Sequence, residues 1–320
     1  MQSLSIVALL LVATGCGVSG GEDPDPDGLA PGVDAPRLRP MTCIAPPAQG
    51  DPAASTVQRE GVERLNCHRN LMGLAPAFLD AQLSAAAQAH ADYVAATGEY
   101  GHVQGQPDHP LFTGSDAASR ALAAGVDLDP LNEALLEVVS YHSDGADPAV
   151  SVDAWIDSVY HRPPLVLPRL DGVGFGSADV FDVMEVVAPW EGNALEVAAY
   201  PGEDQRGVPT SFDTDVESPD PDPDRGVVGY PVTLSMLVEA AGSGGNPYSV
   251  AVDHAATRLE GPDGDVPALI LEPASDDVLM RTVAILPHEP LAPGTTYTAT
   301  MVLDLDGVPL EESWSFTTSR

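Results

Sequence analysis

The chain has 320 residues, enough for two domains that each bury a core, and its 31 prolines and 30 glycines predict many turns. Its 13 basic and 48 acidic residues give a formal net charge of -35, so nucleic-acid phosphates and anionic lipid surfaces would be repelled. The charge argues against a nucleic-acid partner or polybasic membrane binding, and it suits a well-solvated exported protein or one that holds divalent cations.

The N-terminus predicts export. Residues 3–17, SLSIVALLLVATGCG, form an apolar segment too short to span a bilayer, and small residues precede Cys16. Ala13-Thr14-Gly15-Cys16 resembles the bacterial lipobox, in which the cysteine is acylated and becomes the new N-terminus. This resemblance implies that residues 1–16 are a lipoprotein signal peptide and that the N-terminal lipid alone attaches the protein to the outer membrane or cell surface; an ordinary secretory signal is the alternative. Residues 17–54 predict a disordered tether.

Two further cysteines remain if Cys16 carries lipid. Cys43 and Cys67 form an even pair in an oxidising compartment, so we expect a disulfide between them. Two buried free thiols are the alternative, because sequence spacing alone does not show that two sulfur atoms approach each other.

Helical periodicity begins at Ser55. Ser55 and Gln58 fit a capping box at the start of a first helix. A second helix is expected after Asp80, with apolar residues on one face and Gly98 at its end. A third short helix is expected over residues 115–124, capped by Ser115.

A fourth helix is expected over the phrase DAWIDSVYHR, which two prolines follow. Its apolar residues fall on one arc, whereas Asp153, Asp157 and His161 fall on the other at intervals of four residues. One interpretation is that His161 and Arg162 complement the dipole at the helix end and Pro163 stops the helix. The other interpretation is that His161 faces a cleft.

The order of these features is similar to that of the CAP superfamily, the cysteine-rich secretory, antigen 5 and pathogenesis-related 1 proteins, in its bacterial branch. The similarity covers about residues 56–193 and depends on several weak motifs that occur in the family's order. The matching residues are Asn66, Arg69, Gly73 and Leu74 in an N-x-x-R-x-x-x-G-L phrase, then His102, then Glu137, then Trp155, Ser158, His161 and Arg162, and finally Gly172-Val173-Gly174.

This resemblance implies an α+β fold in which residues 55–193 form an α-β-α sandwich. It also implies a cleft whose binding residues here are His102, Glu137 and His161, with Asp157 beside the position where other members carry a second acid and this chain has Ser158. Two imidazoles and one carboxylate suit zinc or another divalent cation, so His102, Glu137 and His161 are the expected metal ligands.

The expected function is binding rather than catalysis. No H-E-x-x-H motif is present, and no catalytic mechanism is common to the resembled family. The expected partners are a small molecule, a lipid or an extracellular protein. The alternative is a metal-assisted extracellular hydrolase of peptide or cell-wall polymer, which would depend on His102 and His161. Ser140, Ser158 and His161 could also be parts of a serine hydrolase, because a triad depends on geometry rather than on sequence order, but neither serine lies in a G-x-S-x-G motif.

Residues 194–320 consist of short β-rich segments separated by Gly, Pro and Asp, which predict a β-sandwich. The final 28 or so residues resemble the end of bacterial Ig-like modules, with Pro293-Gly294-Thr295 before Tyr297, and Trp314 and Phe316 on one strand face. We therefore expect an all-β Ig-like sandwich that acts as a spacer. Residues 211–226, rich in Asp and Pro, are expected to be a solvated loop rather than a calcium site.

Overall fold

The computed structural model describes residues 47–129, 132–142, 147–190, 192, 194–238 and 249–320. The helices are α1 (Thr56–Leu71), α2 (Ala81–Thr97), α3 (Ala117–Ala123), α4 (Pro148–Asp157) and α5 (Arg162–Val166). The strands of the first half are β1 (Gln49–Gly50), β2 (Phe78–Leu79), β3 (Glu133–Tyr141), β4 (Gly172–Ala178) and β5 (Phe181–Pro189). These five strands form one sheet in the order β1-β2-β4-β5-β3.

Helix boundaries follow the capping residues. The Ser55 and Gln58 capping box is present, with Gln58 N donating to Ser55 Oγ at 3.2 Å and Ser55 N to Gln58 Oε1 at 2.8 Å. Asp80 caps α2, and Gly98 ends it in the left-handed conformation at φ 71°. The third helix begins one residue later than expected, because Asp116 rather than Ser115 accepts the N–H of Ser119.

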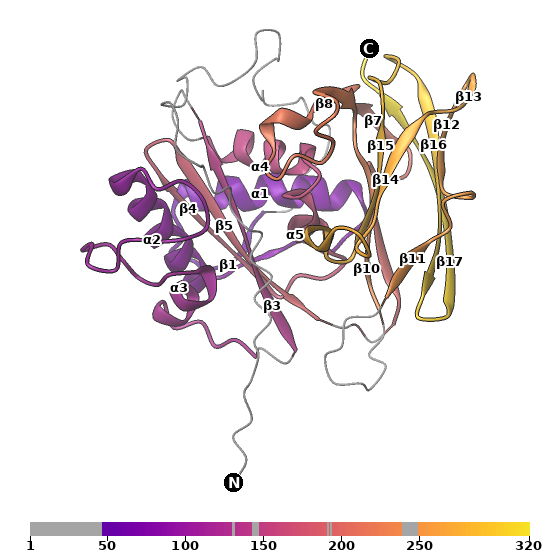
Figure 1. The fold of residues 1–320 in the computed structure, drawn as a ribbon. Helices are drawn as coiled ribbons and strands as arrows, with labels where there is room; N and C mark the ends of the chain where they lie inside the picture. Colours follow the sequence, from indigo (N-terminus) through magenta and orange to yellow (C-terminus); the bar gives the residue numbers. More distant parts are fainter. Residues whose placement is uncertain (1–46, 130–131, 143–146, 191, 193, 239–248) are drawn as a thin grey trace.

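Helices cover both faces of the central sheet, as Figure 1 shows: α2 and α3 lie on one side, and α1, α4 and α5 on the other. The residues of β3 and β5 alternate between the two sides. Val139 and Val183 pack against Ala87 and Ala91 of α2. Their neighbours Val138 and Met184 belong to the core that also contains Trp155 of α4.

Glycine in β4 allows α2 to approach the sheet closely. A Cβ atom on Gly174 would lie 2.1 Å from the backbone carbon of Leu83, and one on Gly176 would lie 2.2 Å from the backbone N of Gln88. Since no side chain fits into that space, glycine is required at positions 174 and 176 by the packing between α2 and β4.

The expected helix through His161 is wrong. Helix α4 ends at Asp157, and the two prolines lie in the first turn of α5, where a missing N–H costs nothing. The expected outward face of this helix is wrong as well. Asp153 is buried rather than exposed. Its carboxylate accepts a hydrogen bond from Arg64 Nε at 2.7 Å and lies 2.8 Å from His68 Nε2, and both residues belong to α1.

The second half is formed almost entirely of strands. These are β6 (Glu196–Tyr200), β7 (Gln205–Val208), β8 (Ser211–Asp213), β9 (Val227–Gly229), β10 (Val232–Leu237), β11 (Val250–Val252), β12 (Arg258–Gly261), β13 (Gly264–Asp265), β14 (Ala268–Leu271), β15 (Thr282–Pro287), β16 (Thr296–Leu305) and β17 (Val308–Thr318). Two 3₁₀ turns, η1 (Thr214–Val216) and η2 (Asp277–Leu279), interrupt them. The larger sheets have the orders β14-β15-β10-β6 and β13-β12-β16-β17-β7, with β11 also paired to β16.

The two larger sheets of the second half lie face to face beyond α1, α4 and α5 (Figure 1), and β8 pairs with β9 in a small separate ribbon. One continuous hydrophobic core joins both halves of the chain, since it contains Trp155 and Phe175 as well as Leu234, Met301 and Trp314. The strand-rich region from residue 194 therefore packs directly against the first half.

Candidate functional site

His102 and Glu137 lie together on the side of the central sheet that α2 and α3 cover. His102 is in the segment after α2, Glu137 is in the middle of β3, and His102 Nδ1 lies 2.8 Å from Glu137 Oε1. The Glu137 side chain is 3% exposed and that of His102 is 15% exposed. The structure thus brings two of the expected site residues together as a buried carboxylate and a partly exposed imidazole.

Arg120 of α3 completes this group. Its guanidinium donates to Glu137 Oε2 and, at 2.9 Å, to the carbonyl oxygen of His102. Glu185 of β5 stands directly opposite Glu137 in the antiparallel register, with its Oε1 3.9 Å from Arg120. Among the described residues, both carboxyl oxygens of Glu185 and Nε of Arg120 are buried without a hydrogen-bond partner.

The pKa values of Glu137 and Glu185 are shifted in opposite directions. Burial opposes the ionisation of Glu137, but the hydrogen bond from His102 and the charge of Arg120 outweigh it and hold its pKa far below the usual range. Burial, reinforced by the negative charge of Glu137, raises the pKa of Glu185 well above its usual value. Arg120 and His102 therefore favour the ionised form of Glu137, whereas burial and the charge of Glu137 favour the neutral form of Glu185.

His161 lies on the opposite side of the sheet and contacts the second half of the chain. Its Nδ1 is 3.0 Å from Oε1 of Glu217, which directly follows η1. The same carboxylate accepts the backbone N–H groups of Val159 at 2.8 Å, Tyr160 at 2.6 Å and His161 at 3.2 Å. Burial opposes the ionisation of Glu217, but the hydrogen bond and charge of His161 and these N–H groups lower its pKa overall.

Asp157 and Arg162 also contact the second half of the chain. Tyr230 Oη donates to Asp157 Oδ1 at 2.6 Å. The fully buried Arg162 donates to the carbonyl oxygens of Ile156 at 2.6 Å and Pro231 at 2.8 Å. The His-Arg pair of the sequence thus lies at an internal interface between the two halves.

The four expected binding residues are therefore not in one cleft. The central sheet separates His102 and Glu137, which face α2 and α3, from His161 and Asp157, which contact Glu217 and Tyr230. Among the described residues no group of three or more His, Cys, Asp or Glu side chains is arranged to hold a metal ion. The structure thus does not assemble the expected zinc ligands His102, Glu137 and His161.

The two serines named in the hydrolase alternative each lie beside a histidine: Ser158 Oγ is 3.3 Å from His161 Nδ1, and Ser140 Oγ is 3.3 Å from His142 Nε2. Ser158 Oγ donates to the carbonyl oxygen of Trp155 at 3.1 Å and caps the turn before His161. Ser140 donates at 3.0 Å to Ser151, whose own hydroxyl contacts the buried Asp182. Since Ser151 is fully buried, a substrate has no access to it.

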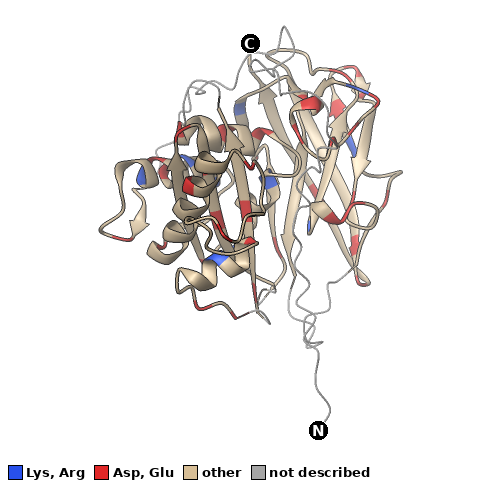
Figure 2. Cartoon of the chain, turned by 60° about the vertical axis from the view of Figure 1, so that its left-hand side comes forward, with Lys and Arg blue, Asp and Glu red and all other residues tan. Residues whose placement is uncertain are grey.

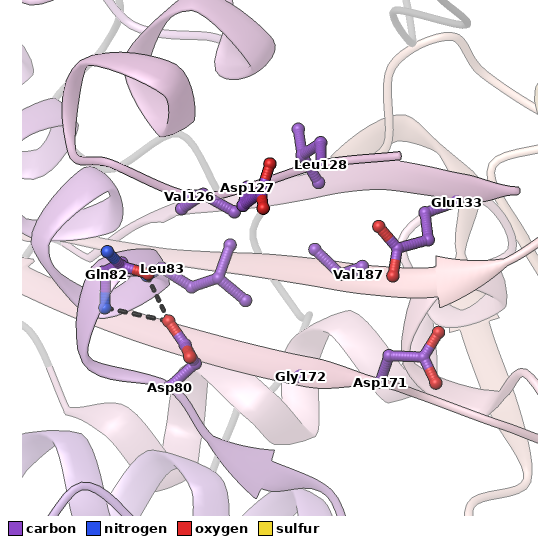
Figure 3. Close-up of a pocket in the computed structure, with 10 residues that line it drawn as sticks. All are labelled: Asp80, Gln82, Leu83, Val126, Asp127, Leu128, Glu133, Asp171, Gly172 and Val187. Atoms are coloured by element: carbon purple, nitrogen blue, oxygen red, sulfur yellow. Dashed lines mark hydrogen bonds between the residues drawn. The ribbon is translucent and has the colours of Figure 1, made fainter. Parts of the chain in front are cut away.

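A pocket of about 200 Å³ lies beside the N-terminus of α2, away from His102. Figure 3 shows the carboxylates of Asp80, Asp127, Glu133 and Asp171 around it, and Asp80 is engaged in capping α2. Burial raises the pKa of Asp171. Asp and Glu residues occur along the chain in both halves of the molecule (Figure 2), so the acidic residues of this pocket are part of the general excess of acidic over basic residues.

Three residues of these two groups were not expected from the sequence. Arg120, Glu185 and Glu217 contact the predicted residues only because the fold brings distant segments together. The expectation that residues 211–226 form a solvated loop is wrong at Glu217, whose side chain is 1% exposed. A charged residue in an otherwise apolar strand, as Glu185 is between Met184 and Val186, was the signal available in the sequence.

Several expectations concern residues outside the described part of the chain. These are the signal peptide, the acylation of Cys16, most of the tether and Cys43. Cys67 lies in α1 and is buried, and its pairing with Cys43 stays a prediction. Within the described part, no helix is long and apolar enough to cross a membrane.

Comparison with known proteins finds a match to one family model in the first half of the chain. Residues 62–187 match the profile of the cysteine-rich secretory protein (CAP) family. Among solved structures, the chain is similar to an extracellular protein containing a SCP domain from Bacillus anthracis str. Ames, with 17% identity and a TM-score of 0.35. That similarity covers 41% of this chain and 39% of the other. No curated protein matches the sequence.

Proposed function

We propose that this CAP-domain protein is an exported, lipid-anchored surface protein that binds a small ligand at His102. The observation that carries the proposal is the pairing of His102 Nδ1 with the buried Glu137, at 2.8 Å. This bond engages Nδ1 and fixes the orientation of the ring, so a ligand would bond to the other ring nitrogen, Nε2, of a side chain that is 15% exposed. Export and lipid anchoring are supported by the apolar N-terminal segment that precedes Cys16.

The surroundings of His102 favour an amphiphilic ligand such as a lipid over a bare cation. Tyr100 and Val103, which flank His102 in the chain, are 61% and 53% exposed. An apolar part of the ligand would cover these side chains, while a polar group would bond to the imidazole. A divalent cation would find one imidazole and would need its other ligands from solvent.

The proposal includes a supporting role for residues 194–320 as an Ig-like sandwich. Its support is the closing pattern of Tyr297, Trp314 and Phe316, all of which are buried. Because this region shares a core with the CAP domain, it would hold the His102 side of the molecule at a fixed position relative to the C-terminus.

Titration of the purified full chain with a dansyl-labelled fatty acid, followed by fluorescence, tests the proposal. The variant His102→Ala should weaken binding about tenfold or more, equivalent to about 1.4 kcal/mol. The matched control is His254→Ala, because His254 also pairs with a glutamate, Glu272 at 3.1 Å, but lies in the second half of the chain. Its affinity should equal that of the wild type.

Absence of wild-type binding, or equal affinity in the two variants, would contradict the proposal. A parallel titration with Zn²⁺ examines the cation alternative in the same samples. Hydrolysis of casein or peptidoglycan that disappears in His102→Ala would instead support the hydrolase. Thermal unfolding of each variant confirms that a loss of binding is not a loss of the fold.

A further inference from the structure

The carboxylate of Glu217 occupies a turn of the CAP domain as a ligand would. Its two oxygens accept three successive backbone N–H groups, those of Val159, Tyr160 and His161, and Oε1 also contacts His161 Nδ1. All four donor–acceptor distances are between 2.6 and 3.2 Å. Converging backbone N–H groups of this kind form a concave site for an anion.

Most of the donors do not depend on the identity of any side chain. The three N–H groups belong to the backbone between α4 and α5, whose path is fixed by the packing of the buried Val159 and by Ser158 Oγ, which accepts the N–H of His161 at 3.0 Å. Removal of the Glu217 side chain would therefore leave the N–H groups of Val159 and Tyr160 in place without this acceptor, whereas the N–H of His161 would keep Ser158 Oγ. The His161 side chain is 24% exposed, so the site lies close to solvent.

The segment that carries Glu217 lies outside the two larger sheets, although Phe212 of β8 and Val228 of β9 pack in one hydrophobic cluster with Leu279, Ala284 and Leu286. Glu217 lies between β8 and β9, which pair with each other but with neither of the larger sheets. Contacts of side chains, such as that of Glu217 with the turn, therefore hold this segment against the CAP domain in place of a continuous strand ladder.

We infer that the turn over residues 158–161 is a carboxylate-binding site and that Glu217 is its built-in ligand. The segment between β8 and β9 is thus a tethered competitor, and an acidic group of an extracellular partner reaches the turn by displacing Glu217. This site is separate from His102, since the central sheet lies between them.

Chemical rescue tests the inference. Thermal unfolding of the purified full-chain Glu217→Ala variant is measured at pH 7 in sodium acetate and in sodium chloride of equal ionic strength. The Tm in chloride should be lower than that of the wild type by about 5 °C, because the turn has lost its acceptor. Acetate at about 0.1 M should restore about 3 °C of that loss if its Kd is about 10 mM.

Two variants serve as controls. Glu217→Gln fills the site with an amide and should be destabilised without any response to acetate. Asp276→Ala removes another carboxylate of the same interface, one that accepts the hydroxyl of Tyr160 at 2.6 Å, and it should respond to acetate no more than the wild type does.

A folded Glu217→Ala variant whose Tm is the same in acetate and chloride would overturn the inference. An equal acetate response in the wild type or in either control would overturn it too, because the effect would then not arise from the vacated turn. If Glu217→Ala does not fold in chloride, the yield of folded protein refolded in acetate decides: recovery supports the site and no recovery overturns it.

Discussion

Replacement of Arg162 by alanine should destabilise the whole protein, not only the turn that carries it. The guanidinium donates to the carbonyl oxygens of Ile156 and Pro231 and lies 4.9 and 5.1 Å from the ring centroids of Tyr200 and Tyr230. Each buried carbonyl left without a donor costs about 1–3 kcal/mol, and the lost cation–π contacts cost about 1 kcal/mol more. The expected loss in the free energy of unfolding is about 4 kcal/mol.

Urea unfolding followed by tryptophan fluorescence measures this loss, because Trp155 and Trp314 report on the two halves of the chain. Arg225→Ala is the matched control, since the Arg225 side chain is partly exposed and, within the described part of the chain, bonds only to Asp222 three residues away, and the change should cost at most about 0.5 kcal/mol. A loss for Arg162→Ala below about 1 kcal/mol, or no larger than that of the control, would refute the energetic role assigned to Arg162.

Two further predictions concern the buried carboxyl groups. At pH 7, Glu185→Gln should change the free energy of unfolding by less than about 1 kcal/mol because burial and the charge of Glu137 favour the neutral form of Glu185, whereas Glu137→Gln should cost about 3 kcal/mol because Arg120 loses its counter-charge. Equal losses in urea unfolding would contradict this assignment. The pKa of Glu217 is lowered by folding, so its stabilising contribution is present above about pH 4.3 and is lost as the pH falls through its folded-state pKa. The stability difference between the wild type and Glu217→Gln should therefore shrink below about pH 4, and a difference that is constant with pH would exclude this linkage.

Local features of the first half could be predicted from the sequence. The capping box of Ser55 and Gln58, the cap of Asp80 and the helix end at Gly98 each depend on residues within a few positions of one another. The Gly-Val-Gly sequence at the start of β4 was part of the family resemblance. The structure explains why Gly174 and Gly176 must be glycine, because α2, about 90 residues earlier in the chain, lies directly against them.

The arrangement of the site could not be predicted in the same way. Helical periodicity placed Asp153 on a solvent face, but Arg64 and His68 of α1 surround it in the fold. His161 was expected beside His102, yet its partner is Glu217, 56 residues further along the chain. Periodicity describes one element at a time, so it cannot show which partner from a distant segment will cover a face.

The hydrophobic cores couple the segment that matches the CAP family to the C-terminal strands. The CAP match ends at residue 187, but Val159 and Tyr160 pack in a hydrophobic cluster with Phe212 and Leu286. A substitution at Val159 must therefore be compatible with residues that lie outside the family match. The segment that matches the CAP family is therefore smaller than the unit that folds around these shared cores, and removal of residues 194–320 would expose the apolar side chains of Val159 and Tyr160.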